Sequence, residues 1–386
     1  MHRPHPLLNG SRAGGTWRAR ARSAFSLIEL LVVMFIIVLV ISIVVPALAK
    51  ARQATRVTAT KNLMSNLLTS AATFQQDERR LPGRYSGRDM GSDNNANTIG
   101  MTMTENILLD LAGGVVQIGG PRPSTGGVHV HPFGGTSSSR ASQEGAWVDV
   151  GLIGQPSKSG KGYFIPDKKF FIEQVNPSQV GTAGTPDADG RTYPDLVDAF
   201  GQPLLVWVED ESTVGRVAFD SSSSGPNNFA RVKSDGNNPP ARHYWNSNAG
   251  FLKSGAMGKK LTNINEESLL GGSMQDTDRA ITLAGLLGSP ASASEIGSIT
   301  TAKPVASILP TASRGKIIIH AAGPDGLFLG RQDTRGRAQF TGEAMHFGFN
   351  FIDPGGGNKL RLNSAGQPEQ VDVAGAFDDE IVSGGS

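Results

Sequence analysis

The sequence predicts an α+β protein in which a long amino-terminal helix packs on a small antiparallel β-sheet with long loop insertions. Three observations support this fold class. An apolar run ahead of residue 46 is long enough to span a membrane, and the polar segment after it repeats its apolar residues with helical spacing. Short β-branched runs bounded by glycines then follow in the second half of the chain. The helix is therefore expected to be membrane-spanning in its first half and amphipathic in its second.

The composition indicates one loop-rich globular domain behind a membrane helix. Of the 386 residues 38% are hydrophobic, which is enough for a core, and 49 Gly with 22 Pro fall short of a disordered composition. The chain has no cysteine, which excludes disulfides and thiolate metal sites. The net charge is +2, and residues 1–24 hold five arginines and no acid, so the remainder carries −3 (2 − 5 = −3). This mildly acidic remainder gives no electrostatic reason to expect nucleic-acid binding.

Residues 1–24 form a basic leader peptide that we exclude from the fold. Positive charges before a spanning helix hold that end in the cytoplasm. We therefore expect a single-pass inner-membrane protein with a cytoplasmic amino terminus and an extracytoplasmic domain. Four basic residues beyond the apolar run weaken this bias without reversing it, namely Lys50, Arg52, Arg56 and Lys61.

The apolar run at residues 25–45 carries one acid. From Leu30 to Val45 only Ser42 is polar, and residues 25–45 as a helix would extend about 31 Å, the thickness of a hydrocarbon core. Glu29 needs a partner there, because a carboxylate in hydrocarbon is costly. A cut between Ala24 and Phe25 would create an amino group four residues before Glu29 that can neutralise it, within one helix or between staggered neighbours.

Two other interpretations of this run remain open. An export signal cut by the general signal peptidase could end at Ala47-Leu48-Ala49, but its apolar core would be unusually long and would contain an acid. A plain uncleaved signal anchor explains the length of the run, but it does not explain why an acid occurs at position 29.

The helix is predicted to continue in register to about Arg79. Its amphipathic part, residues 47–80, has apolar residues at helical spacing, and Leu81-Pro82-Gly83 ends it. Pro46 lacks an amide hydrogen and crowds the carbonyl of Ser42, so we expect a kink there. The apolar positions are Val57, Met64, Leu67, Leu68, Ala71 and Phe74.

The globular part, residues 81–386, is predicted to hold a short helix over residues 104–111 capped by Thr104, and strands over residues 203–208 and 316–320. Residues 345–351 alternate Met and Phe with polar residues or glycine, which predicts a strand whose apolar face seats the helix. Residues 209–315 lie between the strands as a large insertion. His129 and His131 would share a face of an extended segment, as metal ligands or as part of a polar loop.

The stretch Ala24-Phe25-Ser26-Leu27-Ile28-Glu29, after basic residues and before an unbroken apolar run, resembles the prepilin processing site of type IV pilins and type II secretion pseudopilins. The resemblance implies a pilin-like fold, cleavage by prepilin peptidase after Ala24 and N-methylation of Phe25. It also implies that Glu29 pairs with the amino terminus of a neighbouring subunit. Pro46 falls where many pilin helices kink. The family usually has glycine before the cut, where this chain has Ala24.

Three later segments, in this order, are similar to type II secretion major pseudopilins: residues 198–203, 322–326 and 377–381. The first two are separated by a much longer stretch than in that group. The resemblance implies a calcium site, for which this chain offers Asp325, Asp378 and Asp379. The alternative is an ordinary β-turn at Asp325 and a solvated acidic tail.

No catalytic fingerprint for a nucleophile elbow, a phosphate loop or a zinc helix occurs in the chain, so we expect no enzyme. The expected function is that of a structural subunit of a type II pseudopilus or type IV pilus-like filament. Its partners would be prepilin peptidase, other pilin subunits, an inner-membrane assembly platform and membrane lipid. The alternative is a single-pass, membrane-anchored binding or enzymatic domain unrelated to filaments.

Overall fold

The computed structural model divides into two compact units, Met1–Arg52 and Gln53–Ser386, and each is described by itself. The residues that it describes are 26–85, 103–120, 123, 128–130, 146–149, 152–153, 162–173, 194–209, 229–230, 243–244, 286–288, 313–330, 340–341, 344–345, 348–349, 351–353, 359–360, 364–365, 370–371 and 373–385.

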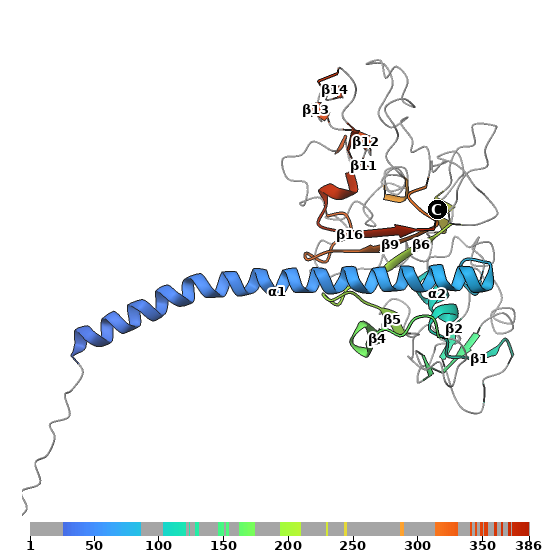
Figure 1. Cartoon of the computed structure of the whole chain (residues 1–386), viewed down its shortest axis with the longest axis horizontal. Coiled ribbons are helices and arrows are strands. Elements are labelled where there is room, and N and C mark those ends of the chain that lie inside the picture. Colours follow the sequence, from blue (N-terminus) through green and yellow to red (C-terminus); the bar gives the residue numbers. More distant parts are fainter. Residues whose placement is uncertain are drawn as a thin grey trace, which may run out of the picture. The chain divides into compact units, whose positions relative to one another are not determined.

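One helix, α1, runs without interruption from Leu27 to Glu78 (Figure 1). The predicted continuous helix is confirmed, and it passes through Pro46. Arg79 adopts a positive φ of 58° directly after it, just before the expected stop at residues 81–83. The kink at Pro46 stays a prediction.

The first half of α1 exposes its apolar side chains. Among the described residues, α1 is the one helix long and apolar enough to cross a membrane. Its exposed fractions include 82% for Leu27, 65% for Phe35 and 59% for Val45. In water such a surface would be unstable, so this half requires lipid or other apolar helices around it.

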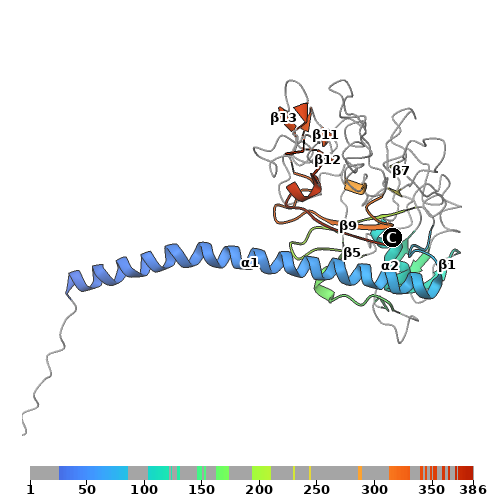
Figure 2. The ribbon, with the colours of Figure 1, turned by 45° about the horizontal axis from the view of Figure 1, so that its top comes forward.

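Among the described residues, the central sheet has three antiparallel strands in the order β16-β9-β6 (Figure 1), and Figure 2 shows its strand β9 in a second view. Strand β6 is Leu205–Val208, β9 is Ile317–Ala321 and β16 is Glu380–Gly384. The strands predicted over residues 203–208 and 316–320 are thus confirmed, and the structure pairs them with each other. All residues of β6 and β9 are buried, because one face meets α1 and the other is covered as well.

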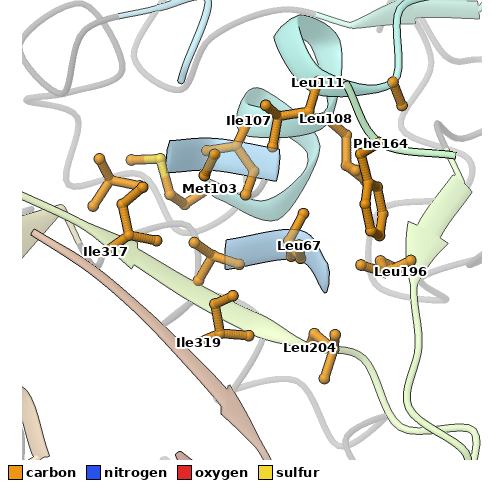
Figure 3. Close-up of a cluster of buried hydrophobic side chains, with 14 of the residues drawn as sticks. Leu67, Met103, Ile107, Leu108, Leu111, Phe164, Leu196, Leu204, Ile317 and Ile319 are labelled. Carbon is orange, nitrogen blue, oxygen red and sulfur yellow. The ribbon is translucent and has the colours of Figure 1, made fainter. Parts of the chain in front are cut away.

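The second half of α1 packs into one core with this sheet and with helix α2, Met103–Leu111 (Figure 3). Leu67 of α1, Ile107 of α2 and Ile319 of β9 are all fully buried in that core. Gly384 of β16 leaves room for α1, since a Cβ there would lie 2.9 Å from the Leu68 side chain. The amphipathic interpretation of residues 47–80 is therefore confirmed at its buried positions. The core members from α1 are Leu63, Met64, Leu67, Ala71 and Phe74.

Helix α2 begins one residue before Thr104, so the expected cap at Thr104 is wrong. The Thr104 hydroxyl lies in the first turn and donates to the carbonyl oxygen of Leu204 at 2.7 Å. A buried hydroxyl needs such a partner, and this bond ties α2 to the start of β6. At the other end of α2, Asp110 accepts from the Arg80 guanidinium at 2.6 Å and from the Gly83 amide at 2.8 Å. The segment that ends α1 is thereby fastened to α2.

The remaining strands form small separate sheets. Within the described ranges, one has three strands in the order β1-β3-β2, and five are two-stranded: β4-β5, β7-β8, β10-β11, β12-β15 and β13-β14. The strands are β1 Val115–Ile118, β2 Val128–Val130, β3 Ala146–Val148, β4 Phe171–Glu173, β5 Pro194–Leu196, β7 Phe229–Ala230, β8 His243–Tyr244, β10 Phe340–Thr341, β11 Ala344–Met345, β12 Gly348–Phe349, β13 Phe351–Asp353, β14 Lys359–Leu360 and β15 Gln370–Val371. The 3-10 helices are η2 Lys168–Phe170 and η4 Val373–Ala376.

The prediction of one strand over residues 345–351 as the seat of α1 is wrong. That stretch is divided among β11, β12 and β13, and each pairs with a different strand. The seat is the β16-β9-β6 sheet, because β6 and β9 offer apolar side chains at nearly every position. Alternation alone cannot show which strand a segment will pair with.

Replacing Leu67 by Ala should lower the free energy of unfolding by about 2–5 kcal/mol, because it leaves a cavity between α1, α2 and the sheet. Chemical denaturation of the full chain in detergent measures this. Ile165→Ala is the control, since Ile165 is 58% exposed and its loss should cost less than about 0.5 kcal/mol. Equal effects of the two substitutions would contradict the core placed here.

Candidate functional site

The predicted processing positions, Ala24 and Phe25, lie outside the described residues. Cleavage after Ala24 and methylation of Phe25 therefore stay predictions. The structure describes the chain from Ser26 onward, which includes Glu29, the acid expected to pair with a neighbouring amino terminus.

Ser26 and Glu29 form a reciprocal pair at the start of α1. The Ser26 backbone amide donates to Oε2 of Glu29 at 2.8 Å, and the Glu29 backbone amide donates to the Ser26 hydroxyl oxygen at 3.2 Å. This is a capping box, in which a Ser side chain and a Glu three residues later satisfy two amides that the helix leaves open. The Ser-x-x-Glu spacing carried this signal, and our sequence reasoning missed it.

The capping box fixes where the Glu29 carboxylate points. It holds the acid against the first turn of α1, at the backbone amide of Ser26. A carboxylate has about four lone-pair sites, so one bond from Ser26 leaves capacity for a cation. The donor is the backbone amide of Ser26, which stays in the chain if the cut falls between Ala24 and Phe25. The arrangement thus permits an additional charged partner at Glu29 without breaking the helix start.

The first pseudopilin-like segment, residues 198–203, is a tight turn between β5 and β6. Oδ1 of Asp198 accepts from the amides of Phe200 and Gln202, both at 2.8 Å, and Gly201 has a φ of +86° that favours glycine. Helix α1 holds the same turn, because the amide of Ala199 donates to the Thr60 hydroxyl at 3.1 Å. The turn is therefore built locally and docked on the helix.

The register of the central sheet brings all three segments to one end of it. Leu205, His320 and Ile381 lie in one row across β6, β9 and β16. Because the strands are antiparallel, the residues before 205, after 320 and before 381 emerge at the same end. The segments also lie close together. Gly326 of the second segment is next to the Gln202 side chain of the first, 3.5 Å from where a Cβ would lie. Gly323 of the second segment lies so close to the carbonyl oxygen of Asp378 in the third that a Cβ would not fit. We call these three segments the turn cluster.

A buried His–Asp pair closes the turn cluster. Nε2 of His320 lies 2.5 Å from Oδ2 of Asp379, and both side chains are fully buried. The amide of Leu329 donates to the same carboxylate at 3.0 Å. The alternative of a solvated acidic tail is thus wrong at Asp379, because the tail enters β16 and its carboxylate is used inside the protein. Sequence reasoning missed His320 as the partner, since the two residues are far apart in the chain.

Two of the three acids predicted to bind calcium already accept hydrogen bonds inside the protein. Asp379 already accepts from His320 and Leu329, and Oδ1 of Asp325 accepts from the amide of Leu327 at 2.8 Å. Within the described part of the chain, no group of three His, Asp or Glu residues could hold a metal ion. Calcium binding by Asp325, Asp378 and Asp379 stays a prediction, which a rise in melting temperature on calcium titration would support. His129 lies in β2 and His131 outside the described residues, so their metal alternative is also untested.

Asp379→Ala should lower the free energy of unfolding by about 2–4 kcal/mol, because the buried His320 and the Leu329 amide would lose their shared acceptor. Chemical denaturation of the full chain in detergent measures the loss. In the control Asp167→Ala, an exposed carboxylate paired with Lys169 is removed, and no measurable change is expected. A stable Asp379→Ala protein would show that the pair does not hold β16 in place.

Comparison with protein-family models matches residues 19–45 to the prokaryotic N-terminal methylation motif. The matched stretch contains Ala24, Phe25 and Glu29 and ends one residue before Pro46. Comparison with curated proteins and with solved structures gave no match. The chain therefore carries the prepilin-type amino-terminal methylation motif on a long apolar helix, as pilins and pseudopilins do.

Proposed function

We propose that this chain is a structural subunit of a type II secretion pseudopilus or a type IV pilus-like filament. The observation that carries the proposal is the methylation motif over residues 19–45, placed at the start of a helix whose apolar side chains are exposed. Prepilin peptidase would cleave after Ala24 and methylate Phe25. The subunit would wait in the inner membrane and then pack with copies or relatives through α1.

Glu29 would set the register between neighbouring subunits. Lipid tails are as apolar as the side chains of α1, so helices in a bilayer gain little from apolar contact alone and can slide along one another. A carboxylate and an amino group in the same medium attract strongly and only at one offset. The capping box supports this role, because it keeps the Glu29 carboxylate at the helix start and leaves it able to accept from a neighbour's Phe25 amine.

The globular unit would face outward from the helix bundle and carry no catalytic role. The turn cluster supports the finer assignment to a secretion pseudopilus, because the segments similar to major pseudopilins lie at one end of a shared sheet. The inner-membrane assembly platform would act on the cytoplasmic side, where the basic leader is expected. The alternative of a membrane-anchored domain unrelated to filaments differs in one measurable respect, which is the mature amino terminus.

Mass spectrometry of the protein from its native cell should find a chain that begins at Phe25 with one added methyl group. Prepilin peptidase acts within the methylation motif, and the cut leaves Ser26 and Glu29 in place. A chain that still begins at Met1, or that begins at Lys50 after an ordinary signal-peptidase cut, would support the anchored-domain alternative and contradict the filament proposal.

Glu29→Gln should leave membrane insertion unchanged and abolish most filament formation. The amide oxygen of Gln can still accept from the Ser26 amide, so the helix start is kept while the negative charge is lost. Membrane fractionation and electron microscopy of sheared filaments measure the two properties. Glu78→Gln makes the same chemical change at the exposed end of α1 and should assemble normally. Normal filaments from Glu29→Gln would refute the register role.

A further inference from the structure

The basic residues that follow the apolar run divide into two pairs. Lys61 forms an ion pair with Glu380 of β16 at 3.0 Å, and the Arg56 guanidinium lies 5.8 Å from the centre of the Phe200 ring. Both contacts are inside the unit Gln53–Ser386. Lys50 and Arg52 belong to the other unit and are exposed. In the part of the chain that the structure describes, neither of them has an ion pair.

Helix α1 has no acid near Lys50 or Arg52. Between Glu29 and Asp77 the sequence contains no Asp or Glu, so no carboxylate lies one turn away from either cation. Among the described residues, neither exposed cation has a carboxylate partner, so both are open to a counter-charge from outside the chain.

The distance of Lys50 and Arg52 from the apolar run indicates where their counter-charge comes from. At a rise of 1.5 Å per residue, Lys50 lies ~8 Å and Arg52 ~11 Å beyond Val45 along α1. The polar headgroup layer on each side of a bilayer is about 5–8 Å thick, and long basic side chains bend toward it from either edge. Arg56 and Lys61 lie ~17 Å and ~24 Å beyond Val45, which is past that layer.

The angular placement also favours lipid over a protein partner. Residues two apart on an α-helix lie about 200° apart, so Lys50 and Arg52 occupy opposite sides of α1. A flat protein surface would meet only one of them. Phospholipid headgroups surround a single helix on all sides and would meet both.

We propose that Lys50 and Arg52 form a cationic collar that binds the phosphate groups of anionic phospholipids while the subunit is stored in the membrane. The collar rests on one part of the proposed function, which is that the subunit is stored in the membrane before assembly. The collar fixes the depth of the stored helix, and its lipid contacts are released when the subunit leaves the bilayer. Each cation near a charged membrane surface strengthens binding by about fivefold.

The test uses the full chain reconstituted in phosphatidylcholine vesicles with trace spin-labelled lipid. Electron spin resonance measures how strongly the protein prefers spin-labelled phosphatidylglycerol over spin-labelled phosphatidylcholine. Lys50→Gln/Arg52→Gln should lower that preference by about fivefold per removed cation, and high salt should lower the preference of the unchanged chain as well. The control Arg56→Gln/Lys61→Gln removes the same charge and should keep the preference. The leader arginines are present in every sample and cancel in the comparison.

Equal preference in both double variants, or a chain that alkaline carbonate extracts from the vesicles, would overturn the collar. So would unchanged lipid preference combined with lost filaments in Lys50→Gln/Arg52→Gln, because the partner would then be a neighbouring subunit. The measurement is made on unassembled protein. A chain that shows the preference and never polymerises overturns the filament proposal alone, and one that polymerises without the preference overturns the collar alone.

Discussion

The packing of the second half of α1 against the β16-β9-β6 sheet is the interaction on which the rest depends. The chain has no cysteine, so the globular unit is held by buried apolar contact and not by covalent links. Fully buried Met64 and Leu67 of α1 meet the sheet, and Thr60 and Lys61 add polar contacts to the turn at Ala199 and to Glu380. Because α1 is one uninterrupted helix, the same element supplies this core and the apolar surface that needs lipid or other helices.

How much the sequence could predict depended on how local each signal was. The helix and the strands β6 and β9 were predictable, since apolar periodicity and β-branched runs act within a few residues. The capping box of Ser26 and Glu29 was equally local and could have been found. The division of residues 345–351 into three strands could not be predicted, because it depends on three different pairing partners. Nor could the His320–Asp379 pair, whose members meet only when β16 closes on β9.

The turn cluster shows how topology creates proximity that linear spacing hides. The insertion between β6 and β9 is long, yet antiparallel pairing returns the chain to the same sheet end whatever the loop length. At this end of the sheet the backbones of Gly323 and Asp378 lie so close together that a Cβ on residue 323 would not fit. Gly323 also has a φ of +68°, which favours glycine. The mismatch in spacing with the major pseudopilins therefore says little about this end of the sheet, because the insertion can grow without moving the turns.

The charged residues of α1 bear on how deep its apolar half lies in a membrane. Glu29 and Lys50 are separated by ~31 Å along the helix, which is about the thickness of a hydrocarbon core. Between them only Ser42 is polar, and its hydroxyl donates to the carbonyl oxygen of Leu39 in the same helix at 2.7 Å. With residues 25–45 in the hydrocarbon core, Lys50 and Arg52 lie ~8 Å and ~11 Å beyond it, so sliding the helix toward its amino end by about two turns would bring both cations to the hydrocarbon. The proposed collar therefore limits the depth of the helix at one end, and under the proposed function Glu29 would meet a neighbour's amine at that depth.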